Sequence, residues 1–461
     1  MLSLKRCLCF LALLFMTMTA EAQQSTPITL KELLNQVDQK APMLLTDSSA
    51  ILIRQAQAAE IRASWLPNLK LNYQADIGTS NNTTGPYFGF GIVPSSSGGV
   101  RPSSVTTAVG DNLGIAALDW EIYNFGKYAA QNRVANSDIR VEQNQYAQSK
   151  YQLQAYTIGS YLQLLRLQDY LNIQYRNIQR NDQIRRSIQS LAKSGVRAGV
   201  DTSIAEAELS KARLNYIELK NQLKQLQLQI ATISGLPYQD IVPDTTVETS
   251  LLNQPNAYQF VSDTANHPLI NFYKSVYQNN LQREDLVKKL YNPKISLEAA
   301  VWERGSSIDG NGNYGAVSNG YGYDRGNYLV GLSLSYNLFD LRRRQLKLRT
   351  QKAATNYSIN KLQEQKQLLA AGASQADAEM ETAIERLKEI PRQLKAANDG
   401  YRQKLSLYKS GLTDIIELNA ALSILYRAET DYAQARYQYT SALFQKAITG
   451  NQVNTVLTLL K

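Results

Sequence analysis

The longest segment without a helix breaker sets the first constraint on this fold. Residues 127–194 contain no proline and a single glycine, Gly159. As one helix rising 1.5 Å per residue, the segment would be about 100 Å long. An average helix of a globular protein has only about 12 residues. Apolar side chains recur there at helical spacing, at Leu153, Tyr156, Tyr161, Leu164, Leu167 and Leu171. The segment therefore predicts a long helix with coiled-coil-like packing.

A second segment of similar length, residues 342–410, indicates that the chain is duplicated. Each long segment leads through a glycine-containing turn into a predicted return helix, 203–233 or 414–448. Ser203 to Glu206 has the form of a capping box for the first return helix. Four landmarks recur in the same order, pairing 65–71 with 291–297, 120–126 with 336–342, 198–200 with 410–412 and 231–235 with 446–450.

These landmarks predict a two-fold internal repeat. The first repeat covers 23–235 and the second covers 267–450, with a linker or equatorial segment, 236–266, between them and a C-terminal tail, 451–461. Each repeat is predicted to contain a helix, two strands joined by a loop, and a long helical hairpin. Thr29 to Glu32 is a capping box for the helix that leads toward Trp65. The loops are 79–112 and 305–327, and the hairpin tips lie near 195–203 and 408–414.

Strict alternation of apolar and polar residues follows Pro67. One face carries Leu69, Leu71, Tyr73, Ala75 and Ile77. Residues 294–301 and 328–338 show the same period, while 113–123 changes parity near Leu118, which suggests a β-bulge. Such stretches have the length of a tilted transmembrane strand, ~9–11 residues. A half-buried sheet of a soluble protein has the same period, so alternation alone leaves both interpretations open.

Aromatic side chains where the predicted strands meet helices favour the membrane interpretation. They are Trp65, Trp120, Tyr123, Phe125, Tyr291, Tyr336 and Phe339. Such rings suit one interface of a bilayer. Four strands cannot close a barrel, and open sheet edges are not tolerated in lipid, so the chain is expected to assemble. Three copies would supply twelve strands.

The first residues, 1–22, have the pattern of a secretory signal peptide. Lys5 and Arg6 precede a short apolar stretch, and Ala20-Glu21-Ala22 fits a cleavage site. We expect cleavage to remove both cysteines, Cys7 and Cys9. It also removes two bases and one acid, so the net charge falls from +10 to +9.

The remaining composition disfavours enzymes, metal sites and nucleic-acid binding. His267 is the only histidine and precedes Pro268 at a predicted helix start, where a structural role is expected. Residues 310–315 match G-x-G-x-x-G, but they lie in a loop between antiparallel strands and not in a βαβ unit. Basic residues are spread along the helices without a recognition element, and Arg342 to Arg344 follow a strand at the expected lipid boundary. We expect no catalytic residue, cofactor, metal or nucleic-acid partner.

The order of elements and three motifs resemble the TolC-like family of outer-membrane efflux proteins. The motifs are the proline before each first strand, the aromatic turn after each second strand, and the two hairpin tips, 194–203 and 408–421. The resemblance implies an α+β membrane protein: a homotrimeric transmembrane β-barrel, four strands per chain, continuous with a long periplasmic α-helical coiled-coil barrel. It also implies a Gram-negative outer-membrane location, contact with outer-membrane lipid, and two partners, a periplasmic adaptor (membrane fusion) protein and an inner-membrane pump.

The resemblance assigns roles to residues at the two tips. Gly199, Val200, Gly411 and Leu412 match positions that contact the adaptor. The aperture or gate positions are Glu417, Tyr408, Thr413, Asp414, Asp201 and Thr202. Thr413 stands where well-known members have an arginine, and Ala420 stands where they have a second acid, so the closing network of this chain is expected to differ. From the residues alone, Glu417 also suits a solvated helix position and Tyr408 also suits coiled-coil packing.

The favoured function is a passive exit duct for efflux or type I secretion. The alternative is an exported coiled-coil structural or adhesive outer-membrane protein without transport activity. That alternative predicts one strand–helix unit at a chain end, whereas here strands occur in the middle of both repeats. The sequence does not distinguish drugs, metals, dyes or peptides as the transported substrate.

Overall fold

The computed structural model describes residues 27–81, 100, 103–195, 198–253, 259 and 261–460. The predicted signal peptide lies outside these residues. The chain divides into two compact units. Unit 1 comprises the described residues up to Ile51, Val141–Ser275 and Ile359 onward, and unit 2 comprises Leu52–Arg140 and Val276–Ser358.

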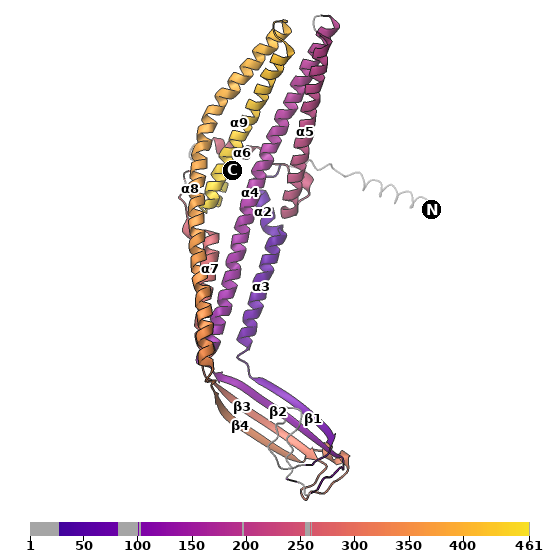
Figure 1. The fold of residues 1–461 in the computed structure, drawn as a ribbon, viewed down its shortest axis with the longest axis vertical. Coiled ribbons are helices and arrows are strands. Elements are labelled where there is room, and N and C mark those ends of the chain that lie inside the picture. The colour runs from indigo at the N-terminus through magenta and orange to yellow at the C-terminus, as the bar shows by residue number, and fades with distance from the viewer. Residues whose placement is uncertain are drawn as a thin grey trace, which may run out of the picture. The chain divides into compact units, whose positions relative to one another are not determined.

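Unit 1 is built from helices, and two long helical hairpins dominate it (Figure 1). The first hairpin joins α4 (Lys127–Lys193) to α5 (Gly199–Ser234), and the second joins α8 (Asp340–Lys409) to α9 (Ile415–Thr449). The beginnings of α4, up to Arg140, and of α8, up to Ser358, belong to unit 2. The remaining helices are α2 (Leu30–Lys40), α6 (Thr246–Leu252), α10 (Val453–Thr458), the beginnings of α3 (Pro42–Ala63) and α7 (Pro268–Leu290), and two short 3-10 turns, η1 (Tyr238–Asp240) and η2 (Thr264–Asn266). The long helices match the predicted breaker-free segments within a few residues.

Two predicted helix starts behave differently. Thr29 caps α2 as expected, because its hydroxyl accepts a hydrogen bond from the Glu32 amide at 3.2 Å. That helix ends before Pro42, however, since proline disfavours helical backbone in the residue before it, and α3 begins anew. The predicted capping box at Ser203 is wrong. α5 already begins at Gly199 and has Asp201 in its first turn. A carboxylate there stabilises the helix by its interaction with the positive end of the helix dipole.

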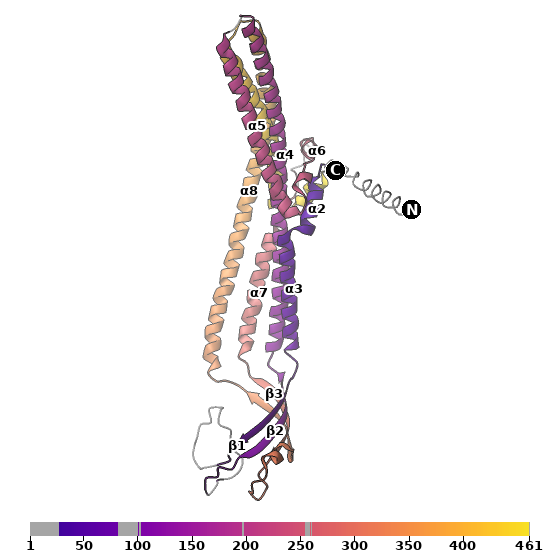
Figure 2. The same ribbon diagram turned by 90° about the vertical axis from the view of Figure 1, so that its right-hand side faces the viewer.

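The core of unit 1 ties the segment between the predicted repeats to the long helices. Tyr161 of α4 is fully buried. Its hydroxyl donates to the Ile28 carbonyl at 3.0 Å and accepts from the Asp244 amide at 2.9 Å. α6 packs on α9, and α10 of the predicted tail buries Val456 completely. Figure 2 shows α2 and α6 beside the long helices.

A partly buried charged cluster lies where α6 meets the long helices. Arg436 of α9 pairs with Asp169 of α4 and, at 2.7 Å, with Glu248 of α6. Burial raises the pKa of Glu248 from 4.5 to about 7, with the Arg436 guanidinium opposing the rise and the Asp169 carboxylate adding to it. One guanidinium thus holds carboxylates from two other elements.

Unit 2 contains one antiparallel sheet with the strand order β1-β2-β3-β4. The strands are β1 (Asn68–Gly78), β2 (Val109–Tyr123), β3 (Lys294–Ser306) and β4 (Arg325–Ser335), as four alternating segments predict. Their register places Leu71, Ala116, Val301 and Tyr328 in one row across the sheet. The neighbouring row on the same face is Leu69, Leu118, Ala299 and Val330. The alternation therefore forms one continuous apolar face, which this chain leaves exposed: Leu71 is 77% exposed and Tyr328 is 82% exposed.

No bulge lies at Leu118, although β2 has an irregularity a few residues further on. Pairing of β2 with both neighbours runs without interruption through Leu118, and the register shifts only between Glu121 and Tyr123. The change of parity has another cause. Ile115 lies on the second face, in the same row as Trp302 of β3, so β2 carries apolar side chains on both faces.

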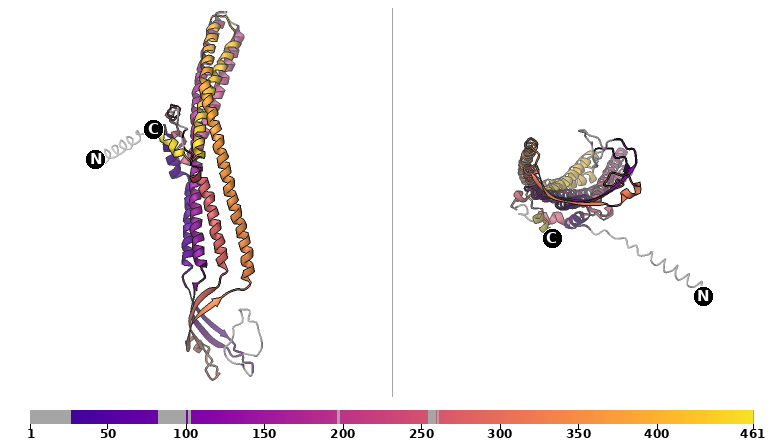
Figure 3. Two further views of the ribbon diagram at one scale, coloured as in Figure 1. Left: turned by 90° about the vertical axis from the view of Figure 1, so that its left-hand side faces the viewer. Right: turned by 90° about the horizontal axis from the view of Figure 1, so that it is seen from below.

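Neither outer edge of the sheet is paired. β1 and β4 each have one neighbour among the described strands. The short 3-10 helix η3 (Val317–Tyr321) packs against β2 and β3. Figure 3 shows the sheet from two further sides. The G-x-G-x-x-G segment lies in the β3–β4 connection, which also contains η3 (Val317–Tyr321), and Asp309 there accepts from the Asn311 and Asn313 amides at 2.9 Å. Among the described helices, none is both long and apolar enough to cross a bilayer.

The raised pKa of Glu248 should make the stability of unit 1 depend on pH. Between pH 4.5 and 7 the folded chain keeps a proton that the unfolded chain releases, so stability falls as pH rises through this window. Glu248→Gln removes this titration. The difference in free energy of unfolding between Glu248→Gln and wild type should grow in favour of the variant from pH 5 to pH 8, by up to ~3 kcal/mol. Thermal melting of both proteins at the two pH values tests this. The exposed Glu385→Gln is the control, and parallel pH profiles for Glu248→Gln and wild type would contradict the prediction.

Candidate functional site: the hairpin tips

The tip of the second hairpin is a tight turn between α8 and α9. Gly411 has φ +78°, a left-handed conformation that suits glycine. The Leu412 amide donates back to the Leu407 carbonyl at 2.9 Å, and the Leu412 side chain is 75% exposed. Asp414 caps α9, since its carboxylate accepts from the Glu417 amide at 2.8 Å. The turn therefore presents an apolar side chain outward while it fixes the first turn of α9.

Glu417 is the centre of a small polar cluster on this tip. Its Oε2 accepts from Lys404 Nζ at 2.6 Å and from the Thr413 hydroxyl. The Lys404 hydrogen bond, then the Thr413 hydrogen bond and the Lys404 charge, lower the pKa of Glu417 below its ordinary value. Glu417 therefore remains ionised and paired within its own chain. Lys404 was not among the residues identified from the sequence, because its contact with Glu417 depends on the register of the two helices across the turn.

Tyr408 has a different environment from Glu417. Its side chain is 1% exposed and lies in an apolar cluster that contains Leu418 and Leu422 of α9. Ile184 and Ile188 of α4 belong to the same cluster. The packing role that the sequence left open for Tyr408 is therefore observed in the chain.

The first tip supplies the other predicted residues. Gly195 follows the end of α4 and has φ +74°, and Ala198 is the N-cap of α5. Gly199 and Val200 begin α5, and Val200 is 62% exposed. Asp201 and Thr202 follow in the first turn. The structure thus brings Thr413, Asp414 and Glu417 together on the second tip, and it places Asp201 and Thr202 on the first.

Ion pairs connect the two hairpins below their tips. Arg180 of α4 donates through both terminal nitrogens to the two Glu429 oxygens of α9, each at 2.8 Å. Such bidentate pairs combine charge with fixed geometry. Arg166 of α4 also lies over the Tyr437 ring of α9, with its guanidinium carbon 4.4 Å from the ring centroid.

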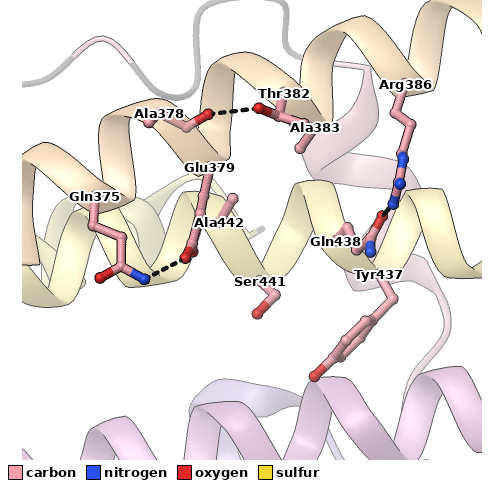
Figure 4. Close-up of a pocket in the computed structure, with 10 residues that line it drawn as sticks. All are labelled: Gln375, Ala378, Glu379, Thr382, Ala383, Arg386, Tyr437, Gln438, Ser441 and Ala442. Atoms are coloured by element: carbon pink, nitrogen blue, oxygen red, sulfur yellow. Dashed lines mark hydrogen bonds between the residues drawn. The ribbon is translucent and has the colours of Figure 1, made fainter.

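A groove of about 420 Å³ lies between α8 and α9, away from the tips (Figure 4). Arg386 donates to Gln438 across it at 2.6 Å, and Gln375 donates to Glu379 at 2.8 Å along α8. None of the residues predicted from the sequence lines this groove. It is lined by Gln375, Ala378, Glu379, Thr382, Ala383, Arg386, Tyr437, Gln438, Ser441 and Ala442.

The seven predicted interface aromatics all belong to unit 2 and lie at or near its strand–helix junctions. Trp65 and Trp120 pack edge to face with centroids 6.1 Å apart, and the Trp120 indole donates to the Trp65 carbonyl at 2.9 Å. Tyr123 and Phe125 form a second pair at 4.7 Å. The others follow the same placement: Tyr291 lies between α7 and β3, and Tyr336 and Phe339 lie between β4 and α8.

His267 occupies a structural position in unit 1. Its Nε2 lies 3.2 Å from the Ile448 carbonyl, its Nδ1 accepts from the Leu269 amide, and its ring packs against Tyr151. Burial lowers the pKa of His267, which favours the neutral ring. Within the described residues, no group of three or more His, Cys, Asp or Glu side chains is placed to hold a metal ion.

Comparison with known proteins agrees with this architecture. Residues 33–236 and 278–445 match the family model described as outer membrane efflux protein. The chain belongs to the outer membrane efflux protein family. This is a family of outer-membrane channel proteins and not of enzymes. Among the curated proteins, none matches the chain.

Solved channels share the fold over most of their length. The chain is similar to the outer-membrane channel OprN, with 19% identity, a TM-score of 0.70, and coverage of 91% of this chain and 89% of that one. VceC from Vibrio cholerae gives 12% identity, a TM-score of 0.73, and coverage of 91% and 96%. The CmeC outer membrane channel of Campylobacter jejuni gives 13% identity, a TM-score of 0.73, and coverage of 92% and 86%.

The Asp414 cap is expected to protect the start of α9 from hydrogen exchange. Asp414→Ala should raise hydrogen exchange in residues 412–418, because α9 loses a cap of about 1 kcal/mol. Asp414→Asn, which keeps an acceptor, should stay close to wild type. Hydrogen exchange followed by mass spectrometry measures both variants. Equal exchange for the alanine variant and wild type would show that the cap does not hold the tip.

Proposed function

We propose that this protein is the outer-membrane exit duct of a tripartite efflux or type I secretion system, which conducts substrates passively. The observation that carries the proposal is the sheet of unit 2, in a chain of the outer membrane efflux protein family. It presents one continuous apolar face, two unpaired edges and aromatic rings at its helical end. A sheet of this kind suits lipid on one face and a lumen on the other.

The open edges support a homotrimer. In lipid each unpaired backbone group costs several kcal/mol, so edge strands must find partners. Pairing β1 of one copy with β4 of the next closes a ring without edges, and three copies give a barrel of twelve strands. The helices of the three chains would then form the periplasmic coiled-coil barrel, with the cell's outer membrane at the sheet end.

The hairpin tips suit contact with a periplasmic adaptor protein, which in turn joins an inner-membrane pump. Val200 and Leu412 are exposed apolar side chains on turns, beside Gly199 and Gly411. Small and apolar residues at such tips allow close approach of another backbone. These four positions are the proposed adaptor contacts.

The gate is proposed to consist of the second-tip cluster with Asp201 and Thr202 from the first tip. Three Glu417 side chains around an axis would attract cations and repel one another if they were free. In this chain each Glu417 already has Lys404 and Thr413 as partners. We therefore propose a ring of carboxylate–ammonium pairs, with Tyr408 packing the helices behind it.

Reconstitution tests the proposed duct. The purified full chain should migrate as a trimer in mild detergent, and it should form ion-conducting pores in planar bilayers. A monomer without conductance would refute the proposal and would favour a structural or adhesive role.

Lys404 predicts the charge selectivity of these pores. Lys404→Met leaves three carboxylates without their ammonium partners and should shift the reversal potential in a salt gradient toward higher cation selectivity. Glu417→Gln should shift it the opposite way, and the double variant should return close to wild type. The exposed Lys395→Met on the same helix is the matched control. Unchanged selectivity of Lys404→Met would remove the pair from the gate.

A further inference from the structure

A strongly basic segment begins α8, directly after the sheet. Residues 341–363 contain seven Lys and Arg residues and no Asp or Glu. The nearest acid, Asp340, pairs with Arg343 at 3.3 Å. Within the described part of the chain, no ion pair engages Arg342, Arg344 or Lys347. Arg342 and Lys347 are exposed and Arg344 is half-buried, so three cationic groups lack an intrachain counter-charge.

Two acidic side chains of the neighbouring junctions have basic partners of their own. Asp285 of α7 pairs with Arg133 at 2.6 Å and with Lys289 at 3.0 Å. Glu121 of β2 lies 3.6 Å from Lys127. Neither of these two carboxylates is therefore a partner of the basic residues at the start of α8.

The position of the segment indicates what kind of partner it has. β4 carries the exposed apolar residues Val330, Leu332 and Leu334, and it ends at Ser335. Tyr336 and Phe339 follow, with Phe339 82% exposed, and α8 begins at Asp340. Apolar strand, aromatic rings and basic residues thus follow one another along the chain, which is the order of hydrocarbon, interface and anionic headgroup in a bilayer.

We propose that Arg342, Arg344 and Lys347 bind the headgroups of anionic phospholipids in the inner leaflet of the membrane that the sheet crosses. The three residues lie within about 8 Å along the helix axis, so their long side chains reach one headgroup layer. The guanidinium groups suit phosphate because they donate in a fixed planar fork. The proposal rests on the proposed membrane placement of the sheet, and it adds a lipid class that the duct selects.

Native mass spectrometry of the full chain in mild detergent tests the proposal. Dioleoyl phosphatidylglycerol and dioleoyl phosphatidylcholine are added separately, and the mass reports bound lipid and oligomeric state together. The test variant is Arg342→Gln, Arg344→Gln, Lys347→Gln, which retains the Arg343–Asp340 pair. The matched control on the same helix is Lys388→Gln, Lys395→Gln, Arg402→Gln, three exposed bases that belong to unit 1.

Wild type and the control should bind phosphatidylglycerol about tenfold more tightly than phosphatidylcholine, and the test variant should lose this preference. Equal binding of the two lipids by wild type overturns the proposal, while pore formation by the same preparation leaves the duct intact. A test variant that falls apart into monomers but retains the lipid preference also overturns it, and it assigns these bases to a contact between copies.

Discussion

Unpaired backbone groups along β1 and β4 are the constraint on which the rest of this structure depends. Antiparallel pairing satisfies both edges of β2 and β3, whereas β1 and β4 each retain a free edge. Beside those edges the sheet exposes leucine, valine and tyrosine on one face. Such a sheet is unfavourable in water through its apolar face and unfavourable in lipid through its edges. Assembly of several copies in a bilayer resolves both problems, and exposed apolar residues of α5, such as Leu214 and Ile217, are consistent with a partner along the helices.

The ion pairs of unit 1 differ in exposure between the middle of the long helices and the second tip. Arg436, Asp169 and Glu248 join α9, α4 and α6 through side chains that are 11% to 25% exposed, so losing one partner leaves a partly buried charge unpaired. Lys404 and Glu417 join the two helices of one hairpin at its solvated tip, where an ion pair contributes little to stability. A weak pair can open and close without unfolding its surroundings. This difference is what a duct with a rigid wall and a changeable entrance requires.

Local periodicity predicted much of the fold, and contacts across turns were beyond its reach. The alternation after Pro67 and the breaker-free segment after Lys127 correspond to β1 and α4, because a strand places alternate side chains on one face and a helix places them along one stripe. The helix start predicted at Ser203 is wrong because the capping-box pattern also fits a helix interior. The change of parity at Leu118 does not mark a bulge because β2 is apolar on both faces. Lys404 was missed since its partner is set by hairpin register, which one chain's periodicity does not encode.

The departure of this chain from its family resemblance now has a physical explanation. Thr413 stands where the resemblance places an arginine, yet the Glu417 carboxylate still has a cation, supplied by Lys404 from the opposite helix of the hairpin. Thr413 adds a hydroxyl donor to the same carboxylate. A lysine is a point charge on a flexible stem, and it lacks the planar fork with which an arginine holds a carboxylate at two points. If the pair closes the entrance, exchanging one cation for the other keeps the charge balance of the ring while it lowers the geometric resistance to opening.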